Sequence, residues 1–300
     1  MTERAPSPPS PGRGRAVWRQ FARHRGALAG GILFALILLA VTLGPLLWPI
    51  APEFIDTAVR NQGPSFAHPF GTDQLGRDTF ARVLAGGRIS LAVGLVAMLL
   101  SLGLGTLIGV LAGTFRWLDG PLMRLTDLFL SLPLLPLLLV MVMLFREALS
   151  GALGPEAGIF LLIVIAIGIT SWMPTARVVR GEVLALRERE FILAARSIGT
   201  SQAMLILRHI LPNVLSPIMV SATLGIANAI ITESALSFLG LGFPPDFATW
   251  GRLLNDATQY IGDYPARAFW PGLMISLTVL SVNYIGDGLR DALDPRLRGR

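Results

Sequence analysis

The sequence predicts an all-α membrane protein, because its composition and its long apolar runs both differ from those of a soluble domain. Of 300 residues, 53% are hydrophobic and only 15% are charged, and the mean hydropathy is +0.62. Six apolar runs have about the length that an α-helix needs to cross a bilayer. A helix also satisfies its own backbone hydrogen bonds in lipid. We therefore expect six transmembrane helices.

The first run has the length of a full span and lacks a clear small-residue cleavage site, so we interpret it as an uncleaved helix and not as a signal peptide. The fourth run is short and needs part of the sequence after it to cross fully. The six runs cover residues 27–48, 89–113, 122–145, 158–173, 214–238 and 269–285.

Residues 1–24 are expected to form a basic, disordered tail, because Pro, Ser, Gly and Arg at its start show no apolar periodicity. Residues 25–300 then form one membrane domain, with an external segment at 49–88. If the tail is cytoplasmic, 18 of the 25 arginines lie on the cytoplasmic side. This excess of positive charge predicts that both termini are cytoplasmic.

The longest polar interruption between two runs is residues 177–212. It contains four consecutive charges, from Arg187 to Glu190, which a bilayer would reject by about 10 kcal/mol. The segment therefore lies outside the membrane, and the same arginine count places it in the cytoplasm. An ordinary amphipathic cytoplasmic loop is the plainer interpretation of this charge pattern.

Helix signals divide this cytoplasmic loop into two parts. Good helix formers occupy 174–198, and Gly199 is the residue that most easily adopts the left-handed conformation ending a helix. Thr200 and Ser201 are N-cap candidates for a second helix over 202–210. That helix is expected to stop before Pro212.

Few polar side chains interrupt the apolar runs. Asn228 and Glu233 lie in the fifth run, and a polar or ionisable group within a span is a candidate for a pathway or gate. Glu233 is near the external end, where hydration would make a structural role equally acceptable. In the second run Gly105, Gly109 and Gly113 predict a smooth helix face for close packing, within this chain or against a partner.

Composition excludes several classes of function. The chain has no lysine, so it has no Walker A motif, and it has no cysteine, which excludes disulfides and thiolate metal sites. The acidic residues after His68 lack the closing glutamate of an EF-hand, so we expect no metal site. The net charge of +6 is explained by arginines beside the spans, so we expect no nucleic-acid partner.

Four stretches of the chain resemble the C-type permeases of oligopeptide and dipeptide ABC importers. Ala194, Ala195 and Gly199, followed by His209 to Pro212, resemble the EAA loop of importer permeases, with Leu193 at the place of the usual glutamate. Glu190 is close enough on the same helix face to replace that acid. The phrases HPFGTDQLGRD (68–78), ESALSFLGLGFPP (233–245) and GDGLRDALDPR (286–296) are typical of the same family.

This resemblance implies the type I ABC importer permease fold in the bacterial cytoplasmic (inner) membrane, with peptides as the substrate class. Members of the family also carry nickel chelates, glutathione or sugars. The EAA loop of the family forms coupling helices that dock on the ATPase. The resemblance therefore assigns ATPase coupling to Glu190, Ala194, Ala195, Gly199, His209 and Pro212.

The implied partners are a second (B-type) permease, two cytoplasmic ATPase subunits, an extracytoplasmic substrate-binding protein and membrane lipid. ATP and Mg would be bound by the ATPase subunits, and no cofactor is expected on this chain. Two other classes of function make different demands on the sequence. A self-sufficient secondary transporter predicts ionisable groups at the midplane and an inverted repeat, and neither is visible. An intramembrane hydrolase needs a catalytic set in the spans, yet all three histidines lie outside them.

Overall fold

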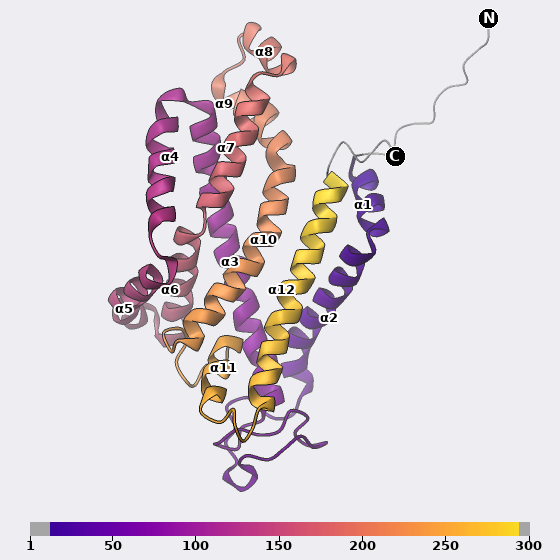
Figure 1. Cartoon of the computed structure of the whole chain (residues 1–300), viewed down its shortest axis with the longest axis vertical. Coiled ribbons are helices and arrows are strands. Elements are labelled where there is room, and N and C mark those ends of the chain that lie inside the picture. The colour runs from indigo at the N-terminus through magenta and orange to yellow at the C-terminus, as the bar shows by residue number, and fades with distance from the viewer. Residues whose placement is uncertain (1–12, 294–300) are drawn as a thin grey trace, which may run out of the picture.

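The computed structural model describes residues 13–293, which fold into a bundle of long helices with no β-strand among them (Figure 1). In chain order the elements are α1 (Arg13–Arg23), α2 (Arg25–Leu47), a 3-10 turn η1 (Thr57–Val59), α3 (Thr79–Thr114), α4 (Arg116–Ser131), α5 (Leu134–Leu153), α6 (Pro155–Thr170), α7 (Met173–Arg187), α8 (Glu190–Ser197), α9 (Gln202–Met204), a π-helical turn η2 (Leu205–Ile210), α10 (Leu211–Phe238), α11 (Trp250–Thr258) and α12 (Ala266–Leu293).

Five helices of the described part are long and apolar enough to cross a membrane, and α6 with α7, bent by 43°, makes a sixth if the pair is counted as one span. The predicted all-α membrane fold is confirmed, with five or six candidate spans in the described residues. Figure 1 shows α8 at one end of the bundle, together with α1 and the C-terminal end of α12. The segment between α2 and α3 lies at the other end with α11. This arrangement agrees with the sides assigned from the arginine count.

The third run, expected as one helix over 122–145, is instead divided between α4 and α5. Leu132 adopts an extended conformation with ψ of 137°, and Pro133 follows it with ψ of 114°. A proline disfavours the helical conformation of the residue before it. The division at Leu132 therefore follows from the ring of Pro133.

Two expectations for the cytoplasmic loop are wrong. The helix expected over 174–198 is interrupted at Glu188, which leaves α8 as a separate short helix. Pro212 does not stop the second helix, because the chain continues without a break from Gln202 to Phe238. The wide turn η2, in which the Leu211 amide donates to the Ile206 carbonyl, allows a proline that has no N–H to enter the helix.

The basic tail is not wholly irregular, because Arg13–Arg23 form α1; residues 1–12 lie outside the described part. Phe21 is the residue that attaches this helix to the bundle. A β-carbon on Gly288 of α12 would lie 3.2 Å from the Phe21 ring, so the two helices approach closely there. The Gln20 side chain also donates to the Asp291 carbonyl at 3.3 Å. Phe21 and Gln20 thus hold part of the expected tail against α12 as a helix.

Four clusters of buried apolar side chains hold the described part of the bundle together, and the smallest of them contains Trp172, Met173 and Ala176. One joins α3, α5, α6 and α10 around Ile163 and Leu236. The second joins α2, α3, α10 and α11 around Trp250. The third lies at the cytoplasmic end, where Val183 of α7, Ile192 of α8 and Ile210 of η2 meet. This third cluster positions the short helix α8.

The glycine face of α3 packs against α7 of the same chain. A β-carbon on Gly105 would lie 2.7 Å from the Thr175 Cβ, and one on Gly109 would lie 2.6 Å from the Ala176 carbonyl oxygen. A β-carbon on Gly113 would lie 2.7 Å from the Val183 Cβ. The intrachain alternative left open by the sequence is therefore the arrangement found in the structure.

Candidate functional site

The cytoplasmic helix α8 begins and ends with distinct local signals. Glu190 occupies its first turn, where a negative charge is favoured by the helix dipole. At its other end Gly199 has φ of 83°. The Gly199 amide donates to the Arg196 carbonyl and the Thr200 amide to the Ala195 carbonyl, at 3.0 and 3.1 Å. These two bonds form a Schellman motif, so the left-handed role predicted for Gly199 is confirmed.

A second cap follows immediately. The Ser201 hydroxyl accepts from the Met204 amide at 3.4 Å, which makes Ser201 the N-cap of the next helix. Ser201 was one of two candidates predicted from the sequence. The turn between α8 and α9 is therefore defined by local chemistry at both of its ends.

The two faces of α8 differ in their surroundings. Ile192 is fully buried and belongs to the third apolar cluster, and Ala195 is also buried, at 7% exposed. Phe191, Leu193 and Ile198 are 44%, 47% and 84% exposed. Ala194 is exposed on the same outer side. We call the outer apolar surface formed by Phe191, Leu193, Ala194 and Ile198 the α8 outer face.

This geometry corrects one expectation from the sequence. The resemblance assigns both Ala194 and Ala195 to the contact with the ATPase. Only Ala194 is accessible to a partner, because Ala195 is buried within the chain. The helical rotation between consecutive residues separates the two roles.

The remaining residues of the predicted coupling set lie beside α8. Glu190 is exposed, and the His209 ring centroid lies 6.4 Å from that of Phe191. The Asn213 side chain donates to the His209 carbonyl at 2.6 Å, which compensates for the irregular hydrogen bonding around Pro212. The structure thus brings the sequence-predicted residues to one end of the bundle.

A cavity of about 320 Å³ lies between the interrupted helices. It is bordered by the end of α4, the start of α5, the junction of α6 with α7, and the middle of α10. Both helix breaks therefore meet at one place, as expected if irregular backbone inside a membrane lines a cavity. Its polar lining groups include Thr170, Ser171, Asn228 and Thr232.

Asn228 and Thr232 lie one turn apart on α10, and the Thr232 hydroxyl donates to the Asn228 carbonyl at 2.7 Å. Asn228 is exposed. Its side-chain amide can both donate and accept, which suits a ligand that carries peptide groups. The cavity therefore offers a small polar surface within largely apolar walls.

Glu233 does not line this cavity. The sequence placed it near the external end, where it would be hydrated, but the structure does not show a hydrated side chain. It is fully buried. The Ser90 hydroxyl of α3 donates to its carboxyl group at 3.0 Å, and the Ser237 hydroxyl donates at 2.8 Å. Ser90 also accepts from the Trp250 amide at 3.2 Å. The Glu233 carboxyl group and Ser90 therefore connect α3, α10 and α11. This geometry indicates a structural role for Glu233.

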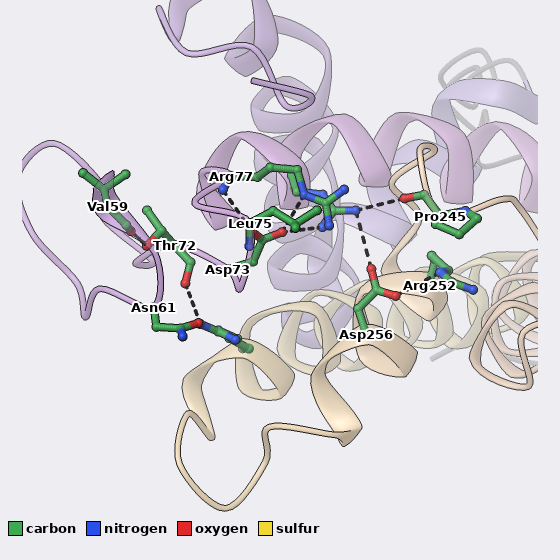
Figure 2. A network of polar contacts seen from close by, with 11 residues as sticks. Val59, Asn61, Thr72, Asp73, Leu75, Arg77, Pro245, Arg252 and Asp256 are labelled. Carbon is green, nitrogen blue, oxygen red and sulfur yellow. Dashed lines mark hydrogen bonds and ion pairs between the residues drawn. The ribbon is translucent and has the colours of Figure 1, made fainter. Parts of the chain in front are cut away.

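The external end contains a second polar centre, built on Asp73 (Figure 2). The Leu75 and Arg77 amides donate to Asp73 Oδ1 at 2.8 and 2.9 Å. Arg77 Nε and Arg82 Nη1 donate to Oδ2 at 2.6 and 2.9 Å. Burial raises the pKa of Asp73, but the Arg77 amide and the charges of Arg77 and Arg82 outweigh it, so the pKa lies below the usual value.

Further ion pairs extend this centre across the external end. Arg82 Nη2 lies 3.6 Å from Asp256 Oδ2, and Arg252 Nε lies 3.0 Å from Asp256 Oδ1. Arg267 Nη2 donates to Asn61 Oδ1 and to the Thr72 carbonyl, at 2.6 and 2.9 Å. We call the group of Asp73, Arg77, Arg82, Arg252, Asp256 and Arg267 the external charge cluster.

Asp78 and Arg82 are four residues apart with the acid first, a spacing that favours an ion pair on a helix, but the two side chains have other partners. Asp78 Oδ1 caps α3 by accepting from the Ala81 amide at 2.7 Å, and Oδ2 lies 2.7 Å from His68 Nδ1. Arg82 instead reaches Asp73 and Asp256. The signal for the cap was present, since aspartate before Thr79 is a preferred N-cap residue. The long-range partner Asp256 had no signal in the sequence.

Comparison with known proteins identifies relatives over nearly the whole chain. Residues 105–299 match the profile of the binding-protein-dependent transport system inner membrane component family. Residues 12–64 match the N-terminal transmembrane domain of oligopeptide transport permease C.

The chain is 44% identical over 280 residues to a putative peptide permease protein of Brucella suis, covering 92% of this chain and 89% of that protein. It is 40% identical over 305 residues to a dipeptide transport system permease protein of Alkalihalophilus pseudofirmus, covering 99% and 97%. It is 40% identical over 287 residues to a glutathione transport system permease protein of Pectobacterium atrosepticum, covering 95% and 91%.

Among solved structures, the fold is similar to a chain of the MetNI methionine ABC transporter in an inward-facing conformation. The TM-score is 0.58 at 19% identity, over 71% of this chain and 97% of that chain. At this level of identity the likeness concerns the fold alone.

Proposed function

Because this chain belongs to the family of binding-protein-dependent transport system inner membrane components, we propose that its substrates are peptides and that it couples to an ATPase through α8. It is a multi-pass permease subunit of the bacterial cytoplasmic membrane. Permeases named for peptides and dipeptides match over most of the chain. The single observation that carries the coupling proposal is the α8 outer face, an apolar surface at the cytoplasmic end of the bundle.

The proposed partners follow from the family and from this surface. A second permease would supply the other half of the pathway, two ATPase subunits would bind ATP and Mg, and an extracytoplasmic binding protein would deliver the substrate. Exposed apolar side chains on a cytoplasmic helix are what an ATPase groove can bury. ATP-driven closure of that groove would displace α8, which is attached to α7 and η2 through Ile192.

The proposed half-pathway is the cavity between the interrupted helices. Its open polar groups, Asn228 and Thr232, can exchange hydrogen bonds with a peptide backbone while the apolar walls tolerate different side chains. Glu233 has no part in this proposal, because it is enclosed by its own hydrogen-bond partners. An assignment to glutathione, which a relative is named for, would need the same surface to accept a second carboxylate.

The coupling proposal is tested by Ala194→Arg in the importer purified from its native membranes and reconstituted into liposomes with its binding protein. Labelled dipeptide uptake and ATP hydrolysis are measured together. The bulky charge on the α8 outer face should abolish ATP-dependent uptake while the amount of inserted chain stays normal. Ala22→Arg is the matched control, since Ala22 is also an exposed alanine on a cytoplasmic helix, α1.

Normal uptake by the Ala194→Arg importer would reject α8 as the coupling element. Uptake by the chain alone, without ATP hydrolysis, would favour the secondary-transporter alternative. Uptake of nickel chelates or sugars in place of peptides would leave the coupling intact and reject only the substrate class.

A further inference from the structure

A small cavity of about 20 Å³ lies inside the external end of the bundle, between the starts of α3 and α12 and the helix α11. This volume holds one particle of the size of a water molecule. The cavity is bordered mainly by polar side chains: Asp73, Gln74, Thr79, Arg82, Asp256 and Arg267. It is therefore a polar site enclosed within the external charge cluster.

Two hydrogen-bond donors that border this cavity have no protein partner. Within the described residues, Arg267 Nη1 and Thr79 Oγ1 are buried and make no hydrogen bond. Their residues are 7% and 6% exposed. A buried donor without a partner, above all on a charged group, is costly, so such a group normally has a ligand or a water.

The guanidinium of Arg267 is held in place on its other side. Nη2 donates to Asn61 Oδ1 and the Thr72 carbonyl, and the group lies 4.4 Å from the Tyr264 ring centroid. Because these contacts fix the side chain, Nη1 cannot turn away to find another acceptor. Nη1 is therefore unpaired because the contacts of Nη2 and of the guanidinium with Tyr264 fix the side chain in this orientation.

The external charge cluster carries more positive than negative charge, with four arginines, Arg77, Arg82, Arg252 and Arg267, against two carboxylates, Asp73 and Asp256. The lining of the cavity itself holds two of these arginines, Arg82 and Arg267, and both carboxylates. Each oxygen of Asp73 already accepts two hydrogen bonds. The nearby Asp78 is occupied by its helix cap and by His68. An anion would reduce this excess of charge and accept from both free donors. A water that donates to Asp256 Oδ2, which lies 3.6 Å from Arg82 Nη2, is the alternative that the experiments below separate from it.

We propose that this cavity is a binding site for a small monovalent anion such as chloride, held by Arg267 Nη1 and Thr79 Oγ1. The bound anion completes the external charge cluster and stabilises the contacts among α3, α11 and α12. This site is independent of peptide transport and of coupling to an ATPase.

The experiment measures thermal unfolding of the purified full-length chain, with its co-purifying subunits, in sodium chloride, sodium bromide or sodium gluconate at one ionic strength. Chloride and bromide should raise the Tm in a saturable manner, and gluconate, too large for the cavity, should not. Thr79→Val removes one donor at nearly constant volume. It should raise the half-saturating chloride concentration about tenfold.

Thr114→Val is the matched control, because Thr114 lies at the opposite end of α3, is also 6% exposed, and also has a buried hydroxyl without a partner in the described residues. It should leave the chloride response unchanged. Equal Tm values in all three salts, or equal chloride responses in wild type and Thr79→Val, would overturn the proposal. General salt effects would shift all variants alike and would therefore count against it.

A second measurement does not depend on the folding of a variant. Crystals of the wild-type chain grown in bromide should show an anomalous peak in the cavity beside Arg267 and Thr79. A water molecule or no density at that position would reject the anion site.

Discussion

The external and cytoplasmic ends of the bundle are built in different ways. At the external end, buried carboxylates and guanidiniums connect α3, α11 and the segment before α3, and Asp73 alone accepts four hydrogen bonds. At the cytoplasmic end, α8 is held by a few apolar side chains, above all Ile192, and its outer face is exposed. Polar side chains at the external end thus connect its elements to one another, whereas the cytoplasmic end leaves the apolar α8 outer face exposed.

This difference has a physical basis. Buried charges depend on well-formed geometry, so breaking one pair is strongly destabilising, and such a network suits a rigid end. A short helix attached by apolar contacts has a modest local stability and an uncovered apolar face. Such a helix is suited to engage a partner and to transmit its displacement to α7 and α10.

The largest effect is expected from Asp73→Asn. Loss of the charge leaves Arg77 and Arg82 without their shared carboxylate, and unfolding of the purified chain should become easier by about 3–5 kcal/mol. Asp127→Asn is the control, because Asp127 pairs with Arg177 on an exposed surface, where both side chains are more than half accessible. That change should cost about 0–1 kcal/mol. Equal losses in the two variants would contradict the contrast between the ends.

A smaller and more local effect is expected from Ile192→Ala. Removing this fully buried side chain should destabilise α8 by about 2–3 kcal/mol, since the cavity left behind adds to the lost apolar burial. Amide hydrogen exchange should rise within α8 and stay unchanged in α11. Leu193→Ala, on the α8 outer face, should reduce uptake without raising exchange. Faster exchange throughout the bundle would show that α8 is not a separate unit.

Acid should weaken the external end through the loss of the Asp73 charge. Because the folded-state pKa of Asp73 is lowered, its contribution to stability is present above the unfolded-state pKa of about 3.9 and is lost as the pH falls through the folded-state value. Unfolding of the wild type should therefore become easier in this acid range, and Asp73→Asn should show a shallower pH dependence. A parallel pH profile for the two proteins would exclude Asp73 as the source.

The smallest effect is expected from Glu233→Gln. The amide keeps an acceptor oxygen for Ser90 or Ser237, so stability should change by about 1 kcal/mol or less. Uptake by the reconstituted importer should be retained, because Glu233 is enclosed and away from the cavity of Asn228. Loss of uptake with normal stability would instead assign an ionisable role in transport to Glu233.

Local signals predicted much of this protein correctly. The long apolar helices follow from the length of the apolar runs, and the arginine-rich segments that were predicted to share one side lie at one end of the bundle. Gly199 and Ser201 perform their predicted capping roles because φ above zero and an N-cap hydroxyl depend on adjacent residues only. The four family motifs were equally readable, and the matched relatives extend over the same stretch of chain.

The sequence did not show where side chains meet across the bundle. Ala194 and Ala195 are adjacent and identical in chemistry, yet only the packing of Ile192 against the third apolar cluster determines which of them is accessible. Likewise, Arg82 pairs with Asp73 and Asp256 and not with Asp78, which is only four residues away in the sequence. Its pairing with Asp256 is possible because the fold brings α11 beside the start of α3.

The sequence by itself thus determined the all-α membrane class, the apolar helices and the helix caps, since apolar length and backbone preference are properties of a single segment. Only the tertiary structure decided that Glu233 is enclosed, that Ala194 faces outward and that Arg267 borders a cavity. Burial and pairing of polar groups depend on distances between segments far apart in the chain, and those distances are set by how the helices pack.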